Sequence, residues 1–161
     1  MTKDHSHALI FIVEDDPLYV EILKYHLSLN PDNDVESFST GQECLSQLHR
    51  KPDLVTLDFR LPDMQGDQVL KRIKDVDPDI EVVIISGQED VNTAVDCLRE
   101  GAFEYIVKDE NAKDRLWNAT NNILKNRKLK RENENLKEEV RQKYDFEKSI
   151  IGNSRAIKKV F

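Results

Sequence analysis

Five short apolar runs alternate along the chain with longer segments in which apolar residues recur at helical spacing. The runs are continuous rather than alternating, as is typical of strands that are covered on both faces. We expect strands at Ala8–Val13, Val35–Phe38, Leu54–Asp58, Val82–Ser86 and Phe103–Val107.

The segments between the runs predict five helices joined by short connections. Asp16 can cap the first of them and Pro17 suits its first turn. The others are expected to begin near Gly41, Gly66, Val91 and Ala112. Strands that alternate with helices predict an α/β fold with right-handed crossovers, here a flavodoxin-like, doubly wound, five-stranded parallel sheet of order 2-1-3-4-5 with a C-terminal helical extension.

Charge divides the 161 residues into two parts. Residues 1–110 hold 10 Lys/Arg against 24 Asp/Glu, whereas residues 111–161 hold 14 against 7. The pattern indicates an acidic globular part and a basic tail. Because an acidic surface repels phosphate, direct nucleic-acid binding by this fragment is disfavoured.

Cellular location and cysteine chemistry are also constrained. The chain has neither a long apolar run nor a signal-peptide pattern, so we expect a cytoplasmic protein that does not bind membranes. Cys44 and Cys97 stand alone in apolar helical contexts, which favours buried thiols over a disulfide or a metal pair.

Chemically active side chains stand at the ends of four strands. Glu14 and Asp15 follow the first run, Asp58 ends the third, Ser86 ends the fourth and Lys108 follows the fifth. The carboxyl ends of parallel strands meet at one edge of a sheet. Three carboxylates there would require a cation, and oxygen ligands favour Mg²⁺ or Mn²⁺. A carboxylate beside such a metal can attack phosphorus, with a lysine and a hydroxyl to balance the phosphoryl charge.

Each residue alone has an ordinary explanation. Asp58 could cap a helix, and the pair Glu14 and Asp15 could compensate a helix dipole. Ser86 could be a turn hydroxyl and Lys108 a solvated lysine. The four strand ends together, in this order, favour a functional site with Asp58 as its reactive group.

Four segments resemble the response-regulator receiver domain of bacterial two-component signalling. They are Ile12–Asp16, Leu57–Gly66, Ile84–Gly87 and Gly101–Lys108, and the resemblance extends from residue 8 to about residue 125. It implies that Asp58 accepts phosphate from a sensor histidine kinase. It also implies that Asp15, Asp58 and the backbone carbonyl of Arg60 bind Mg²⁺, with Glu14 acting through water.

The same resemblance implies a switch. Ser86 and Lys108 would contact the phosphoryl group, and Tyr105 would turn inward as Ser86 moves toward phosphate. The face built from the fourth helix, fifth strand and fifth helix, about residues 90–125, would then change shape. Without the resemblance, Tyr105 is an ordinary half-buried strand aromatic.

One position departs from the family pattern. Receiver domains usually have Pro after the lysine, often with a cis peptide, whereas Lys108 is followed by Asp109. A cis bond before a non-proline residue costs about 3 kcal/mol. We therefore expect a trans bond and an altered loop.

The tail predicts a short coiled coil that would form a homodimer. Leu129 and Leu136 occupy d positions, and Asn126, Asn133 and Val140 occupy a positions. About two heptads are marginal alone, so the alternative is a solvated helix that extends the last receiver helix.

The final segment resembles the opening of the central ATPase domain of sigma-54-dependent activators. We expect a receiver domain at 1–124, a helical linker at 125–146 and the start of a truncated ATPase domain at 147–161. No GxxxxGK[ST] loop occurs, so this fragment would not bind ATP in that way. The full-length regulator would bind DNA, ATP and sigma-54 RNA polymerase.

Two alternatives remain. A Mg²⁺-dependent phosphohydrolase would use Asp58 as its nucleophile, but such enzymes usually place a second acid two residues later, where this chain has Arg60. A scaffold with a degenerate site is disfavoured because all the expected site residues are present.

Overall fold

The computed structural model describes the backbone of residues 7–159 and the side chains of residues 7–150. Its five strands form one parallel sheet of order β2-β1-β3-β4-β5. This confirms the predicted doubly wound, flavodoxin-like sheet. The chain divides into two compact units, Met1–Leu124 and Lys125–Phe161.

The strands and helices alternate along the first unit, and the last helix continues into the second. The strands are β1 (Ala8–Val13), β2 (Asn33–Phe38), β3 (Leu54–Asp58), β4 (Glu81–Ser86) and β5 (Glu104–Val107). The helices are α1 (Pro17–Leu27), α2 (Gly41–Ser46), the 3₁₀ turn η1 (Leu48–Arg50), α3 (Gly66–Val76), α4 (Val91–Arg99) and α5 (Ala112–Lys159).

Side chains set several helix starts. The Asp16 carboxylate accepts a hydrogen bond from the Leu18 N–H at the start of α1, and the Asp90 carboxylate caps α4 in the same way. Each cap satisfies an N–H group that has no partner within its helix. The α1 cap is important for the site because it lies directly after Asp15.

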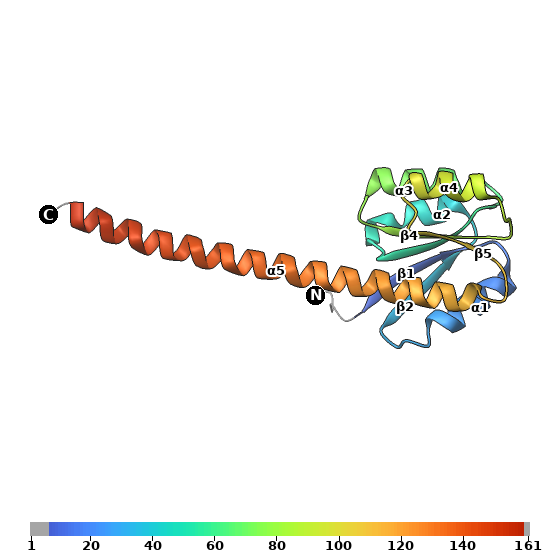
Figure 1. Cartoon of the computed structure of the whole chain (residues 1–161), viewed down its shortest axis with the longest axis horizontal. Coiled ribbons are helices and arrows are strands. Elements are labelled where there is room, and N and C mark those ends of the chain that lie inside the picture. Colours follow the sequence, from blue (N-terminus) through green and yellow to red (C-terminus); the bar gives the residue numbers. More distant parts are fainter. Residues whose placement is uncertain (1–6, 160–161) are drawn as a thin grey trace. The chain divides into compact units, whose positions relative to one another are not determined.

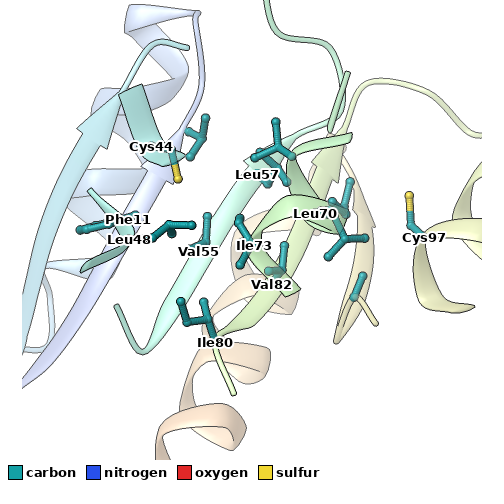
Figure 2. Packing of buried hydrophobic residues seen from close by; sticks show 14 of the residues in the cluster. Phe11, Cys44, Leu48, Val55, Leu57, Leu70, Ile73, Ile80, Val82 and Cys97 are labelled. Atoms are coloured by element: carbon teal, nitrogen blue, oxygen red, sulfur yellow. The ribbon is translucent and has the colours of Figure 1, made fainter. Parts of the chain in front are cut away.

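Helices cover both faces of the sheet (Figure 1). The helices α2, α3 and α4 lie on one face, where Phe11, Val55 and Leu57 pack against Leu70 and other apolar residues (Figure 2). The helices α1 and the first part of α5 lie on the other face, over a second cluster of buried apolar side chains. Coverage of both faces explains why the strands are continuous apolar runs.

The predicted strand bounds need small corrections. The strand β2 begins at Asn33 rather than Val35, because the β1 register pairs Ala8 with Asn33 although the first β2 residues are polar. Likewise β4 begins at Glu81, and β5 begins at Glu104 instead of Phe103. Hydrogen bonding to a neighbouring strand decides these bounds, and hydrophobicity alone does not reveal it.

Two further expectations concern the cysteines and membranes. Cys44 and Cys97 are buried and free, as the sequence predicts. Within the described part of the chain, no helix combines the length and apolar character needed to cross a bilayer.

Candidate functional site

The sheet register brings the predicted site residues to one edge. Val13, the residue before Glu14, pairs with Leu57, the residue before Asp58. On the other side of β3, Asp58 pairs with Ile85, and Ser86 then pairs with Val107. Four strands therefore deliver their last residues to neighbouring positions.

Three carboxylates gather at this edge. Glu14, Asp15 and Asp58 each offer an oxygen atom, and these atoms lie within 4.8 Å of one another. Glu14 and Asp58 are buried, whereas Asp15 is exposed. This donor set could hold a hard cation, because Mg²⁺ is bound through carboxylate oxygens and usually keeps several waters.

Lys108 neutralises part of the charge of this cluster. Its Nζ forms an ion pair with Glu14 Oε1 and lies 3.5 Å from Asp58 Oδ2. Burial raises the pKa of Glu14 to about 7, assisted by a hydrogen bond with Asp58 and opposed by Lys108. Burial also acts to lower the pKa of Lys108, but the hydrogen bond to Glu14 and the charge of Asp58 raise it above its usual value.

An open cleft of about 280 Å³ adjoins Asp58. It is lined by Asp58, Arg60, Ser86, Gly87, Gln88 and Lys108. The cleft is large enough for a phosphoryl group, and Ser86 and Lys108 line it together with Asp58. Arg60 is exposed, and its backbone N–H donates to Asp58 Oδ1 over 3.4 Å.

Tyr105 is linked to the cleft through one residue. Its side chain is buried, and its hydroxyl donates a hydrogen bond of 3.0 Å to the Gln88 carbonyl oxygen. The Gln88 backbone N–H in turn donates to Ser86 Oγ over 3.1 Å. Ser86 and Tyr105 are therefore connected through the backbone of Gln88, with Tyr105 turned inward in this structure.

The peptide bond between Lys108 and Asp109 is trans, as predicted. Residues 7–159 contain no cis peptide. The Lys108 N–H donates to the Ser86 carbonyl oxygen over 2.7 Å, and Asp109 Oδ1 accepts from the Asn111 N–H over 2.9 Å. Asp109 thus helps to start α5 and fixes the main chain beside the lysine.

Two residues near the site were missed by sequence reasoning. The Tyr19 ring in α1 lies under Lys108, with Nζ 4.5 Å from the ring centroid. An aromatic residue close behind Asp15 and Asp16 was a signal that could have been noticed. Gln88 carries no such signal, because its contribution comes from backbone atoms.

The residues of the predicted linker seam all lie on α5 and are exposed. They are Asn126, Leu129, Asn133, Leu136 and Val140. The second unit therefore presents an apolar and amide stripe to its surroundings. Whether this stripe forms a coiled coil stays a prediction, as does the division into a linker at 125–146 and the start of an ATPase domain at 147–161. The latter depends mostly on side chains outside the described residues.

Comparisons with known proteins give consistent results. The family model for the response regulator receiver domain matches residues 10–121. The chain is 34% identical to the regulatory protein LuxO of Vibrio cholerae over 139 residues, 85% of this chain and 29% of that protein. It is 26% identical to the C4-dicarboxylate transport transcriptional regulatory protein DctD of Pseudomonas aeruginosa over 155 residues, 96% of this chain and 33% of that protein.

A solved structure agrees with these sequences. The crystal structure of the signal receiver domain of a LuxO repressor protein from Vibrio parahaemolyticus superposes with a TM-score of 0.72 at 31% identity, covering 77% of this chain and 95% of that one. The chain spans about a third or less of the length of the two curated relatives. The matched residues include each strand end of the site, and the chain belongs to the response regulator receiver domain family.

Proposed function

We propose that Asp58 accepts a phosphoryl group from a phosphohistidine of a sensor histidine kinase. The observation that supports this most strongly is the cleft itself. A buried carboxylate there lies within 4.8 Å of two further acids and 3.5 Å from a lysine ammonium. Three acids beside one ammonium leave excess negative charge, which a divalent cation can balance.

The donor set fits Mg²⁺, with Mn²⁺ as an alternative. Asp15, Asp58 and the backbone carbonyl of Arg60 would hold the ion, and Glu14 would act through water. When bound, Mg²⁺ would neutralise the charge that accumulates on the phosphoryl oxygens. The exposed Asp15 and the buried Asp58 together give the ion access from solvent and a fixed position.

The chain's own residues perform the transfer. An Asp58 oxygen attacks phosphorus, the bond from phosphorus to the kinase imidazole nitrogen breaks, and its electron pair stays on the nitrogen. The product is an acyl phosphate on Asp58. Lys108 balances charge on one phosphoryl oxygen and the Ser86 hydroxyl donates to another. The Arg60 N–H, already 3.4 Å from Asp58 Oδ1, keeps the carboxylate oriented.

The signal leaves the cleft through Ser86 and Tyr105. If Ser86 turns toward a phosphoryl oxygen, Gln88 loses its 3.1 Å hydrogen bond to the hydroxyl. The same residue holds Tyr105 through its carbonyl oxygen. A change at Ser86 therefore alters the packing of Tyr105 and the face formed by α4, β5 and α5. Several large apolar side chains in α4 and in the connection to β5 are exposed: Val91, Val95, Leu98 and Phe103.

The downstream effect would be a change in a homodimer. The stripe that includes Leu129, Leu136 and Val140 is apolar and 53–66% exposed, as expected for a seam that another helix covers. In the full-length cytoplasmic regulator, this change would control sigma-54-dependent transcription through ATPase and DNA-binding domains. The relative DctD is itself described as a transcriptional regulator.

A phosphohydrolase that turns over small phosphate esters is less well supported. The residue two positions after Asp58 is Arg60, which cannot serve as a general acid at neutral pH. A receiver domain needs no such acid, because its kinase supplies an activated phosphoryl group.

Beryllium fluoride with Mg²⁺, which mimics a phosphoryl group on a carboxylate, tests the proposal. Amide NMR shifts should change around Ser86, Gln88 and Tyr105, and light scattering should report whether the dimer forms or dissociates. Asp58→Asn, which keeps the side-chain volume, is the matched control and should abolish both responses. Equal responses in this variant would refute the proposal.

A further inference from the structure

We propose that Tyr19 is a positioning residue that holds the Lys108 ammonium in the phosphoryl cleft. The inference assumes the proposed phosphotransfer to Asp58, but its contact with Lys108 can be tested separately. The Tyr19 ring centroid lies 4.5 Å from Lys108 Nζ, within the range of a cation–π interaction.

The ring is held in place from two directions. Asp16 caps α1, so the helix begins at Pro17, two residues after Asp15, and this start fixes the position of Tyr19 in the first turns of the helix. The Tyr19 side chain is partly buried and packs against the apolar cluster between the sheet and the helices α1 and α5. The helix that follows Asp15 therefore places a fixed aromatic ring beside the site.

Lys108 needs such a partner in this chain. Its neighbour is Asp109 rather than proline, and hydrogen bonds such as that to Ser86 fix only the main chain. The Lys108 side chain is a flexible four-carbon stem that is 22% exposed, so the backbone does not determine the position of the ammonium.

The other partners of Lys108 are also the candidate metal ligands. In this structure the ammonium forms ion pairs with Glu14 and Asp58. Mg²⁺ would bind Asp58 directly and Glu14 through water, so both carboxylates would hold the lysine less strongly when the ion is bound. The Tyr19 ring is no metal ligand, so its attraction for the ammonium persists when the carboxylates are engaged. The ring thus keeps Lys108 beside the incoming phosphoryl group.

Tyr19→Leu in the full chain tests the inference, since leucine keeps apolar packing but lacks a π face. Phosphorylation by acetyl phosphate with Mg²⁺, followed by intact mass spectrometry, should slow by about 2- to 30-fold, as expected for a partly exposed to desolvated cation–π contact. Tyr19→Phe keeps the ring and should retain the rate. Tyr25→Leu, the same exchange at a 73% exposed position of α1, is the matched control.

A second background separates positioning from folding. In Lys108→Met, adding Tyr19→Leu should slow the remaining reaction no further, because the ammonium is already absent. An equal loss in both backgrounds, or a loss in Tyr19→Phe as large as in Tyr19→Leu, would overturn the inference.

NMR of ¹³C-labelled lysine reports the contact without any phosphotransfer. The Lys108 Hε protons should be shifted upfield by the ring current in the wild-type protein and in Tyr19→Phe, and Tyr19→Leu should remove the shift. If the shift is present and the wild-type protein is not phosphorylated, the proposed function fails while the contact stands. If the shift is absent in the wild-type protein, the positioning inference fails.

Discussion

Gly66, the first residue of α3, lies close against the strand end that carries Asp58. A Cβ atom at this position would lie 2.7 Å from Phe59 Cα and 2.8 Å from the Asp58 carbonyl oxygen. Carbon atoms in good contact are separated by about 3.5–4.0 Å, so Gly66→Ala forces main-chain atoms apart by about 1 Å. Neither obstacle is a flexible side chain.

Overpacking of this kind costs about 1–3 kcal/mol, and the better helix propensity of alanine offsets at most about 1 kcal/mol. Each kcal/mol lowers the melting temperature of a domain of this size by about 4 °C. Gly66→Ala should therefore melt several degrees below the wild-type protein. It should also phosphorylate more slowly, because the Asp58 main chain must move.

Thermal unfolding followed by circular dichroism measures the effect. Gly87→Ala is the matched control, because a Cβ there meets no atom within 4 Å. This variant should be unchanged or more stable by about 0.4–1 kcal/mol. If both alanine variants melt at the same temperature, the close approach at Gly66 does not constrain the chain and the reasoning is refuted.

Three other predictions follow from single groups. Asp63→Ala should lower the free energy of unfolding, measured by chemical denaturation, by about 0.5–2 kcal/mol. The reason is that the Asp63 carboxylate accepts hydrogen bonds from the Gly41 and Gln42 N–H groups at the start of α2. A variant as stable as the wild-type protein would contradict this. The pKa of Glu14 is raised from 4.5 to about 7 in the folded protein, so its stabilising contribution is full below pH 4.5 and is lost as pH rises through about 7. Unfolding free energies should therefore fall over this range relative to Glu14→Gln, and parallel pH profiles would count against it. Burial raises the pKa of Cys44 to about 12 and that of Cys97 to about 11. Iodoacetamide should therefore label neither thiol at pH 8 until the protein unfolds. Rapid labelling of the native protein would show that a thiol is accessible and contradict this.

Much of the fold could be predicted because local patterns and tertiary packing agree. The runs that contain Phe11, Leu57 and Ile84 are buried on both faces, and such runs stand out in a sequence. The strand ends could be predicted for the same reason, since Asp58 and Ser86 stop apolar runs abruptly. The topology then brings them together without further information.

The parts that were missed depend on contacts between distant segments. The polar start of β2 at Asn33 joins the sheet only because β1 offers backbone partners. The cation–π contact between Tyr19 and Lys108 joins residues that are far apart in sequence; the position of Tyr19 shortly after Asp15 and Asp16 hints at a place near the site but does not identify its partner. The resemblance named Tyr105 as a residue that turns inward, but its hydrogen-bond partner, the Gln88 carbonyl oxygen, is a backbone atom that no side-chain pattern can reveal.

The central claim is that separate strands assemble acids, a hydroxyl and an ammonium so that Asp58 can carry a labile phosphoryl group. The most direct test treats the folded protein with acetyl phosphate and Mg²⁺ and measures its intact mass. The wild-type protein should gain the mass of one phosphoryl group. The wild-type protein in EDTA and the Asp58→Asn variant should gain no mass. An unchanged mass of the folded wild-type protein, or the same gain in Asp58→Asn, would contradict the account.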